Sequence, residues 1–144
     1  MQVHYKREAI ATFDAAPYTV FRYMSAGNHP HAAFKSHRLV GTAGNIVTLT
    51  AEVYNPDGST FTTTIRHKLN PYPPAAIETT MNGGPFDGAR FVHSYTPAEG
   101  RTRVDLEGDF PAFPGMSEAD ELKMIDSFFA TVFAEDAATL RNWS

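Results

Sequence analysis

The final stretch of the sequence, residues 117–143, constrains the fold most, because its hydrophobic residues repeat with a helical period over several turns. At about 100° per residue, its large apolar side chains fall within an arc of roughly 100°. These side chains are Leu122, Ile125, Phe129, Val132, Phe133, Leu140 and Trp143. Ser117 followed by Asp120 is a capping pattern typical of a helix start. The pattern predicts a long amphipathic helix with one face in the core.

Asp136 interrupts this apolar stripe, one turn after Val132 and one turn before Leu140. An isolated buried carboxylate is costly, so Asp136 must find a partner or become protonated. Arg7, Tyr95 or a histidine could serve as that partner. Two interpretations follow, a satisfied structural carboxylate or an acid or base that faces a ligand.

The chain before this helix shows strand signals separated by turn residues. Residues 3–13 alternate as a strand, and Asp14 then offers an N-cap for a helix with Pro17 in its first turn. A second short helical segment is expected around residues 31–35. Six further strands are predicted over residues 38–41, 45–54, 60–69, 76–81, 90–95 and 103–109. Their short turns favour antiparallel neighbours.

Alternation along these strands assigns their faces. Ile65 and His67 fall on the same side as Phe61, while threonines and basic residues fill the opposite side. Phe91, His93 and Tyr95 likewise share an inward face, because Arg90 favours water. We therefore expect an α+β fold, in which a seven-stranded antiparallel sheet has one wet face and covers its dry face with the final helix.

Composition narrows the class of protein. The 144 residues predict a single domain, 1–144, with 42% hydrophobic and 19% charged residues. A net charge of −4 without a basic run argues against nucleic acid and anionic membrane surfaces. The absence of cysteine excludes disulfides and thiolate chemistry. No secretion signal or membrane-spanning run is present, so we expect a cytoplasmic protein, either monomer or homodimer, without membrane insertion.

Histidines supply most of the candidate chemistry. His67 and His93 lie two strands apart, so we expect a separation of roughly 10 Å, short enough for one ligand but long for one metal ion. Either ring could instead be a core histidine bonded to backbone or to a phenol. His29, His31 and His37 form a loose group that we interpret as a surface loop. No metal site is predicted, because a His-x-His pattern without a nearby carboxylate is a weak signal. No cofactor is predicted, because nucleotide and phosphate motifs are lacking.

A mouth for a cavity is suggested by aromatic residues among prolines and glycines. In a meander, alternate turns lie at the same end, so the loop around Phe86 and the connection carrying Phe110, Phe113 and Met116 should meet. They could form an apolar rim around a ligand. The alternative is a small core cluster beneath the start of the final helix.

The order of a strand, two short helices, six strands and a long C-terminal helix resembles the START-like (SRPBCC) helix-grip superfamily. The most specific pieces are residues 13–17 (Phe-Asp-Ala-Ala-Pro) leading into Val20 and Phe21, and the closing helix over residues 129–143. The resemblance implies a hydrophobic cavity between sheet and helix, used for lipid, sterol or polyketide binding and in some branches for cyclisation or dehydration. It transfers no catalytic residue.

Three functions follow as hypotheses. The first is binding or carriage of an apolar small molecule, with Ile65, His67, Phe91, His93, Tyr95, Phe129, Phe133 and Asp136 around the cavity. The second is a cyclase- or dehydratase-like enzyme that uses the polar members of this set for proton transfer. The third is a co-chaperone-like interaction module, although the threonine-rich outer face offers no large apolar patch.

Overall fold

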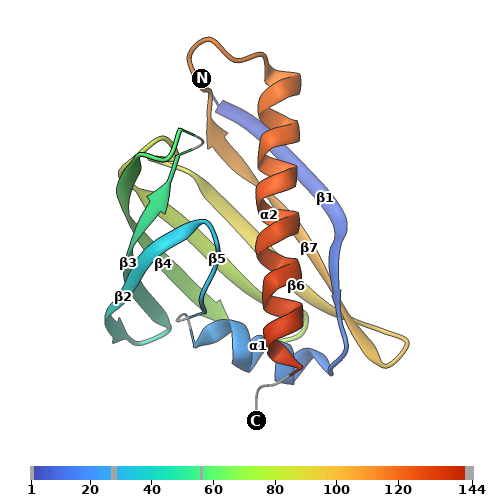
Figure 1. Cartoon of the computed structure of the whole chain (residues 1–144). Coiled ribbons are helices and arrows are strands. Elements are labelled where there is room, and N and C mark those ends of the chain that lie inside the picture. Colours follow the sequence, from blue (N-terminus) through green and yellow to red (C-terminus); the bar gives the residue numbers. More distant parts are fainter. Residues whose placement is uncertain (1, 27–28, 56, 142–144) are drawn as a thin grey trace.

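The computed structural model describes residues 2–26, 29–55 and 57–141. The predicted stripe member Trp143 lies outside these residues. The described elements, drawn in Figure 1, are β1 (Gln2–Phe13), α1 (Pro17–Ser25), β2 (Phe34–Ala43), β3 (Ile46–Tyr54), β4 (Thr60–Asn70), β5 (Ala75–Asn82), β6 (Arg90–Ala98), β7 (Arg101–Pro111) and α2 (Glu118–Leu140).

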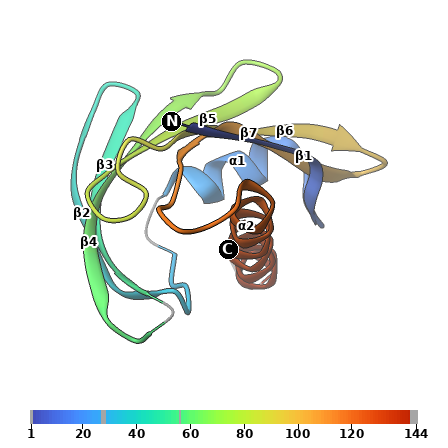
Figure 2. The ribbon, with the colours of Figure 1, turned by 90° about the horizontal axis from the view of Figure 1, so that it is seen from above.

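All seven strands form one antiparallel sheet in the order β1-β7-β6-β5-β4-β3-β2. Strands β2 to β7 follow one another as a meander, and β1 closes the order by pairing with β7. Viewed along α2, the sheet curls around that helix, with α1 across one end (Figure 2). The predicted seven-stranded α+β architecture is confirmed.

Helix α2 places the predicted apolar stripe against the concave face of the sheet. The buried members of the stripe are Ile125, Phe129, Phe133 and Leu140. The ring centroids of Phe129 and of Phe91 on β6 lie 4.9 Å apart. Ser117 is the N-cap, and its hydroxyl accepts a hydrogen bond from the backbone N–H of Asp120. Long helices of this kind gain most of their stability from such packing.

The inward faces predicted from alternation are also confirmed. Along β3 and β7 the burial pattern alternates, and Leu49 and Leu106 are among the buried residues. Ile65, Phe91, His93 and Tyr95 are buried as well.

Two local predictions are wrong. Residues 31–35 form no helix, because the chain makes a turn in which Phe34 N–H donates to the His31 carbonyl, and β2 then begins at Phe34 to pair with β3. Strand pairing here overrides the weak local helix preference. Asp14 does not cap α1: the N-cap is Ala16, and the Asp14 carboxylate instead pairs with Arg101 and Arg141.

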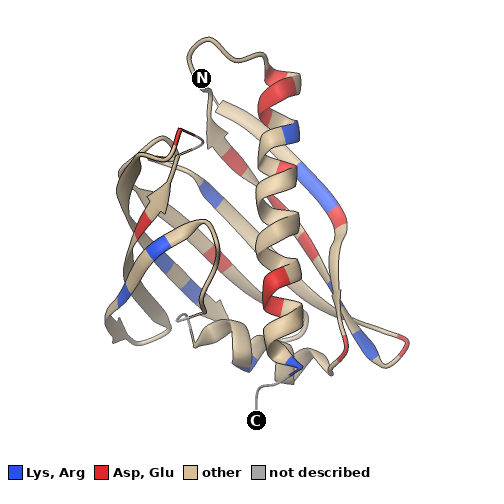
Figure 3. Ribbon diagram, in the orientation of Figure 1, with Lys and Arg blue, Asp and Glu red and all other residues tan. Residues whose placement is uncertain are grey.

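Charged residues of both signs are interspersed over the ribbon, and acidic residues gather at the start of α2 (Figure 3). Negative charge at a helix N-terminus is favoured by the helix dipole. Among the described residues, no helix is both long enough and apolar enough to cross a membrane.

Candidate functional site

A cavity of about 120 Å³ lies between α2 and the concave face of the sheet. At about 30 Å³ per water in the liquid, a space of this size corresponds to roughly four water molecules. Its wall is mainly apolar, and the aromatic members are Phe34, Phe61, Phe86, Phe91, Phe128, Phe129 and Phe133. Met24 and Met81 add flexible side chains that adapt to irregular shapes. Such a wall favours an apolar ligand over water molecules that would find few hydrogen-bond partners there.

Most of the residues expected around a cavity lie on its wall. They are Ile65, His67, Phe91, His93, Phe129, Phe133 and Asp136. Tyr95 is the exception, because it is fully buried behind His93 and reaches the cavity only through that ring. Alternation on β4 and β6 brings this set together beneath the middle of α2.

A chain of hydrogen bonds runs through three strands at the polar end of the cavity. The hydroxyl of Tyr95 lies 2.5 Å from Nδ1 of His93. Nε2 of His93 lies 3.2 Å from Oγ1 of Thr79, which in turn lies 2.7 Å from Nδ1 of His67. His93, Thr79 and Tyr95 are buried, whereas His67 keeps partial exposure and borders the cavity.

The two rings are closer than the strand spacing predicts. Their centroids lie 6.3 Å apart rather than roughly 10 Å, because both side chains lean toward Thr79 on the intervening strand. Burial lowers the pKa of His67 to about 4 and that of His93 to about 3. Both rings are therefore neutral near pH 7, and each carries one N–H donor and one acceptor nitrogen. His93 therefore fits the alternative interpretation from the sequence, a core histidine that is hydrogen-bonded to a phenol, here that of Tyr95.

Asp136 is only 1% exposed, and its Oδ1 atom has no hydrogen-bond partner among the described residues. Burial, followed by the nearby charge of Glu135, raises the pKa of Asp136 to about 8. The carboxyl is therefore largely protonated at neutral pH. Arg7, one of the predicted partners, instead pairs with Asp126 at 2.8 Å.

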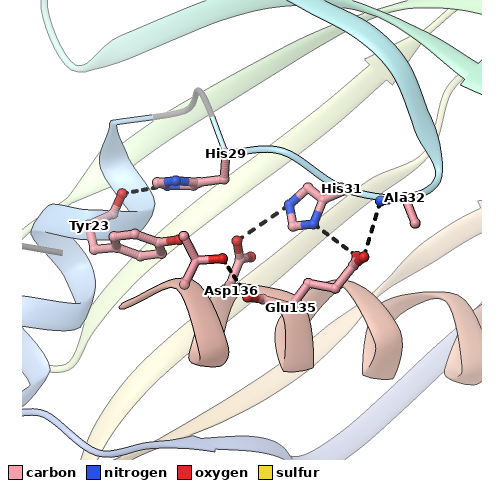
Figure 4. A network of polar contacts seen from close by, with 7 residues as sticks. Tyr23, His29, His31, Ala32, Glu135 and Asp136 are labelled. Carbon is pink, nitrogen blue, oxygen red and sulfur yellow. Dashed lines mark hydrogen bonds and ion pairs between the residues drawn. The ribbon is translucent and has the colours of Figure 1, made fainter. Parts of the chain in front are cut away.

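His31 faces Asp136, with Nε2 at 3.4 Å from Oδ1 (Figure 4). The other ring nitrogen, Nδ1, lies 3.1 Å from Oε1 of Glu135, and the second oxygen of Glu135 accepts from the backbone N–H of Ala32. An ionised Glu135 requires Nδ1 of His31 to carry the proton, so Nε2 presents a lone pair toward Asp136. Glu135 thus orients His31 and ties the segment before β2 to α2.

His29 and His37 also line the cavity, so interpreting the three histidines as a surface loop was wrong. Nε2 of His29 lies 2.6 Å from the Tyr23 carbonyl oxygen, and its ring stacks on Tyr23 at 4.0 Å. Burial lowers the pKa values of His29 and His31 below their usual range. Within residues 2–26, 29–55 and 57–141, no group of three or more His, Asp or Glu side chains is placed to hold a metal ion.

The predicted mouth needs correction. Phe86 lines the cavity, but Phe110, Phe113 and Met116 do not. Phe110 is completely buried against Phe91 and Phe129, and Phe113 packs on Phe86. The backbone N–H of Phe113 also donates to the buried carboxylate of Glu121 on the first turn of α2. Phe110 and Phe113 therefore form the small core beneath the helix start, and Met116 is exposed.

Solved structures with this arrangement are known. TTHA0849 from Thermus thermophilus is 14% identical over 100% of this chain and 99% of its own, with a TM-score of 0.78. The Zhui aromatase/cyclase from Streptomyces sp. R1128 is 15% identical over 98% and 94% of the two chains, with a TM-score of 0.71. Ara h 8.0201 is 16% identical over 99% of both, also at 0.71.

The sequence itself gives no comparable match: no protein-family model and no curated protein matches it. At these identities the structural similarity identifies the fold and leaves the activity open. The seven-stranded sheet, the helix it grips and these neighbours together show that the chain has the helix-grip fold.

Proposed function

We propose that this protein binds an apolar small molecule that contains a ring, in the cavity between α2 and the sheet. The observation that carries the proposal is the cavity itself, about 120 Å³ in volume, with an aromatic wall and a few polar groups at one end. Ligand sites typically combine such apolar walls with a small number of placed polar groups. Ring-shaped ligands fit because the wall consists largely of phenylalanine rings, which favour stacked and edge-to-face contacts.

The polar groups of the wall support a bound ligand rather than a filled core. Oδ1 of Asp136 is buried without a hydrogen-bond partner among the described residues. Nε2 of the half-buried His67 ring on the cavity wall has no hydrogen bond to these residues either. Buried polar atoms without partners are rare in native cores. In the proposed complex the apolar body of the ligand contacts Ile65, Phe91 and Phe129, and a polar group of the ligand meets His67 or Asp136.

A matched pair of valine variants tests the site. Val53 on β3 lines the cavity, whereas Val92 on β6 lies on the outer face of the sheet. Val53→Phe should weaken binding of a neutral fluorescent probe such as N-phenyl-1-naphthylamine by roughly tenfold or more, because the added ring occupies the space of the ligand. Val92→Phe should leave the affinity unchanged. Equal affinities for both variants and the unmodified protein would place the probe elsewhere and defeat the proposal.

A second candidate function is acid–base catalysis on such a ligand, of the cyclase or dehydratase kind. The pair that favours it is Asp136, protonated at neutral pH, beside His31, whose Nε2 can accept a proton. A structurally similar protein is an aromatase/cyclase, which agrees with this candidate. Proton exchange at the α-carbon of 2-tetralone in D₂O, followed by NMR, is a direct assay. Catalysis predicts exchange faster than buffer and a loss of roughly 10²-fold or more in Asp136→Asn, whereas a carrier gives no acceleration.

A role as a protein interaction module has less support. The outer positions of β4 include Thr62, Arg66 and Lys68, which are exposed and polar. Apolar patches of several hundred Å² usually mark docking surfaces, and these described positions of β4 contribute no exposed apolar side chain to one.

A further inference from the structure

We propose that the ligand carries a hydrogen-bond acceptor, such as a ketone or ether oxygen, which accepts from the Nε2–H group of His67, and that the buried chain from Tyr95 fixes this preference. The inference rests on the proposed binding function. It deepens that proposal by stating which chemistry the polar end of the cavity recognises.

The direction of the hydrogen bonds follows from counting donors. Among the described residues, the Tyr95 hydroxyl has one hydrogen-bond partner, Nδ1 of His93, and the Thr79 hydroxyl has two, one on each histidine. A buried O–H group without an acceptor is costly, so each hydroxyl should donate. Tyr95 must then donate to Nδ1 of His93, which leaves the His93 proton on Nε2.

The same logic continues along the chain. The Nε2–H group of His93 donates to Oγ1 of Thr79, so the Thr79 hydroxyl donates to Nδ1 of His67. Nδ1 of His67 is then an acceptor, and the proton of this neutral ring resides on Nε2. Among the described residues Nε2 of His67 has no hydrogen-bond partner, and this ring borders the cavity.

Two other arrangements fail this count. Reversing every hydrogen bond places both histidine protons on Nδ1 and leaves the Tyr95 hydroxyl hydrogen without an acceptor among the described residues. If both rings donate to Thr79, the Thr79 hydrogen has no acceptor among the hydrogen bonds of the described residues. Protonating either ring is disfavoured, because burial lowers the pKa of each. Tyr95, His93 and Thr79 are therefore positioning residues, and His67 is the member of this hydrogen-bonded chain that donates to the ligand.

The first test uses the ligand-free protein. Long-range ¹H–¹⁵N NMR correlations distinguish protonated from unprotonated ring nitrogens and so report the tautomer of each histidine. The inference predicts Nε2–H in both His67 and His93. A proton on Nδ1 of either ring would overturn it, whatever the protein binds.

The second test uses two nearly isosteric probes, 2-acetylnaphthalene, which has a ketone oxygen, and 2-isopropenylnaphthalene, which has a methylene group there. The ratio of their dissociation constants should shift against the ketone by roughly threefold to tenfold in His67→Phe. His4→Phe is the matched control, because His4 is an exposed histidine that pairs with Glu107 and Asp109 away from this cavity, and it should leave the ratio unchanged.

The outcomes separate the two proposals. If both probes bind in the cavity but His67→Phe does not change their ratio, the acceptor inference is wrong and the binding function stands. An equal shift in His4→Phe also overturns the inference, since the effect would not be specific to His67. If neither probe binds the unmodified protein, the proposed function fails and the inference fails with it.

Discussion

Replacement of Asp136 by asparagine should stabilise the protein near neutral pH. The pKa of this carboxyl is about 8 in the folded protein, against an ordinary value of 3.8. Between these values the folded state holds one proton more than the unfolded chain. The free energy of unfolding therefore falls as pH rises, by about 1.4 kcal/mol per pH unit.

The magnitude follows by summing this slope. Over the interval from about pH 4 to about pH 7, this slope lowers the free energy of unfolding by about 4 kcal/mol in total. Solvent screening does not reduce this figure, because the carboxyl is buried almost completely. Asparagine has nearly the same shape and cannot ionise, and its amide N–H can donate toward Nε2 of His31. Asp136→Asn should thus match the unmodified protein near pH 4 and exceed its stability by up to about 4 kcal/mol near pH 7.

Urea unfolding at several pH values measures this difference, and Asp126→Asn is the matched control. Asp126 lies on the same helix, but hydrogen bonds from Tyr5 and then Arg7 lower its pKa. The ionised Asp126 carboxylate stabilises the folded protein above its pKa in the unfolded chain, and this stabilisation disappears as pH falls through its pKa in the folded protein. Asp126→Asn should therefore be less stable than the unmodified protein at neutral pH and equally stable in acid. If Asp136→Asn shows the same pH slope as the unmodified protein, the argument from burial is refuted.

Three further variants test packing, capping and the segment before β2. Phe129→Ala should lower the free energy of unfolding by about 3–5 kcal/mol, and the half-buried Phe128→Ala by less; equal losses would contradict the packing described for α2. Ser117→Ala should lower the free energy of unfolding by about 1 kcal/mol in the same urea assay, and no change would show that the N-cap hydrogen bond does not stabilise the protein. Glu135→Gln weakens the contacts to His31 and Ala32, so the Ala32 amide should exchange with deuterium faster, and an unaltered rate would show that another contact holds this segment.

Much of the fold could be predicted from periodicity. The stripe of α2 and the alternation on β3, β4, β6 and β7 gave correct faces, because burial in a two-layer fold follows these periods. The inward positions of His67 and His93 followed directly. Their hydrogen bonds to Thr79 could not be predicted, because alternation gives the face on which a side chain lies but not its rotamer.

The polar partners of α2 could not be predicted, because they come from distant parts of the chain. His31 and Glu135 lie 104 positions apart in the sequence. The wrong prediction of a helix over residues 31–35 also gave no reason to place His31 beside α2. Glu121 carries a charge on the first turn of α2, yet it is buried and accepts a hydrogen bond from the backbone N–H of Phe113. A His-x-His pattern before a strand was the available signal for His31, and it is too weak to select a partner.

The central claim is that an apolar ligand occupies the space between α2 and the sheet, and nuclear Overhauser effects from a bound probe to labelled methyl groups test it most directly. Ile65 lines the cavity, whereas Ile46 lies exposed at the start of β3. With N-phenyl-1-naphthylamine bound, the account predicts intermolecular effects to the methyl groups of Ile65, Met24 and Met81 and none to Ile46. Saturable binding that gives effects to Ile46 and none to the cavity methyl groups would contradict it.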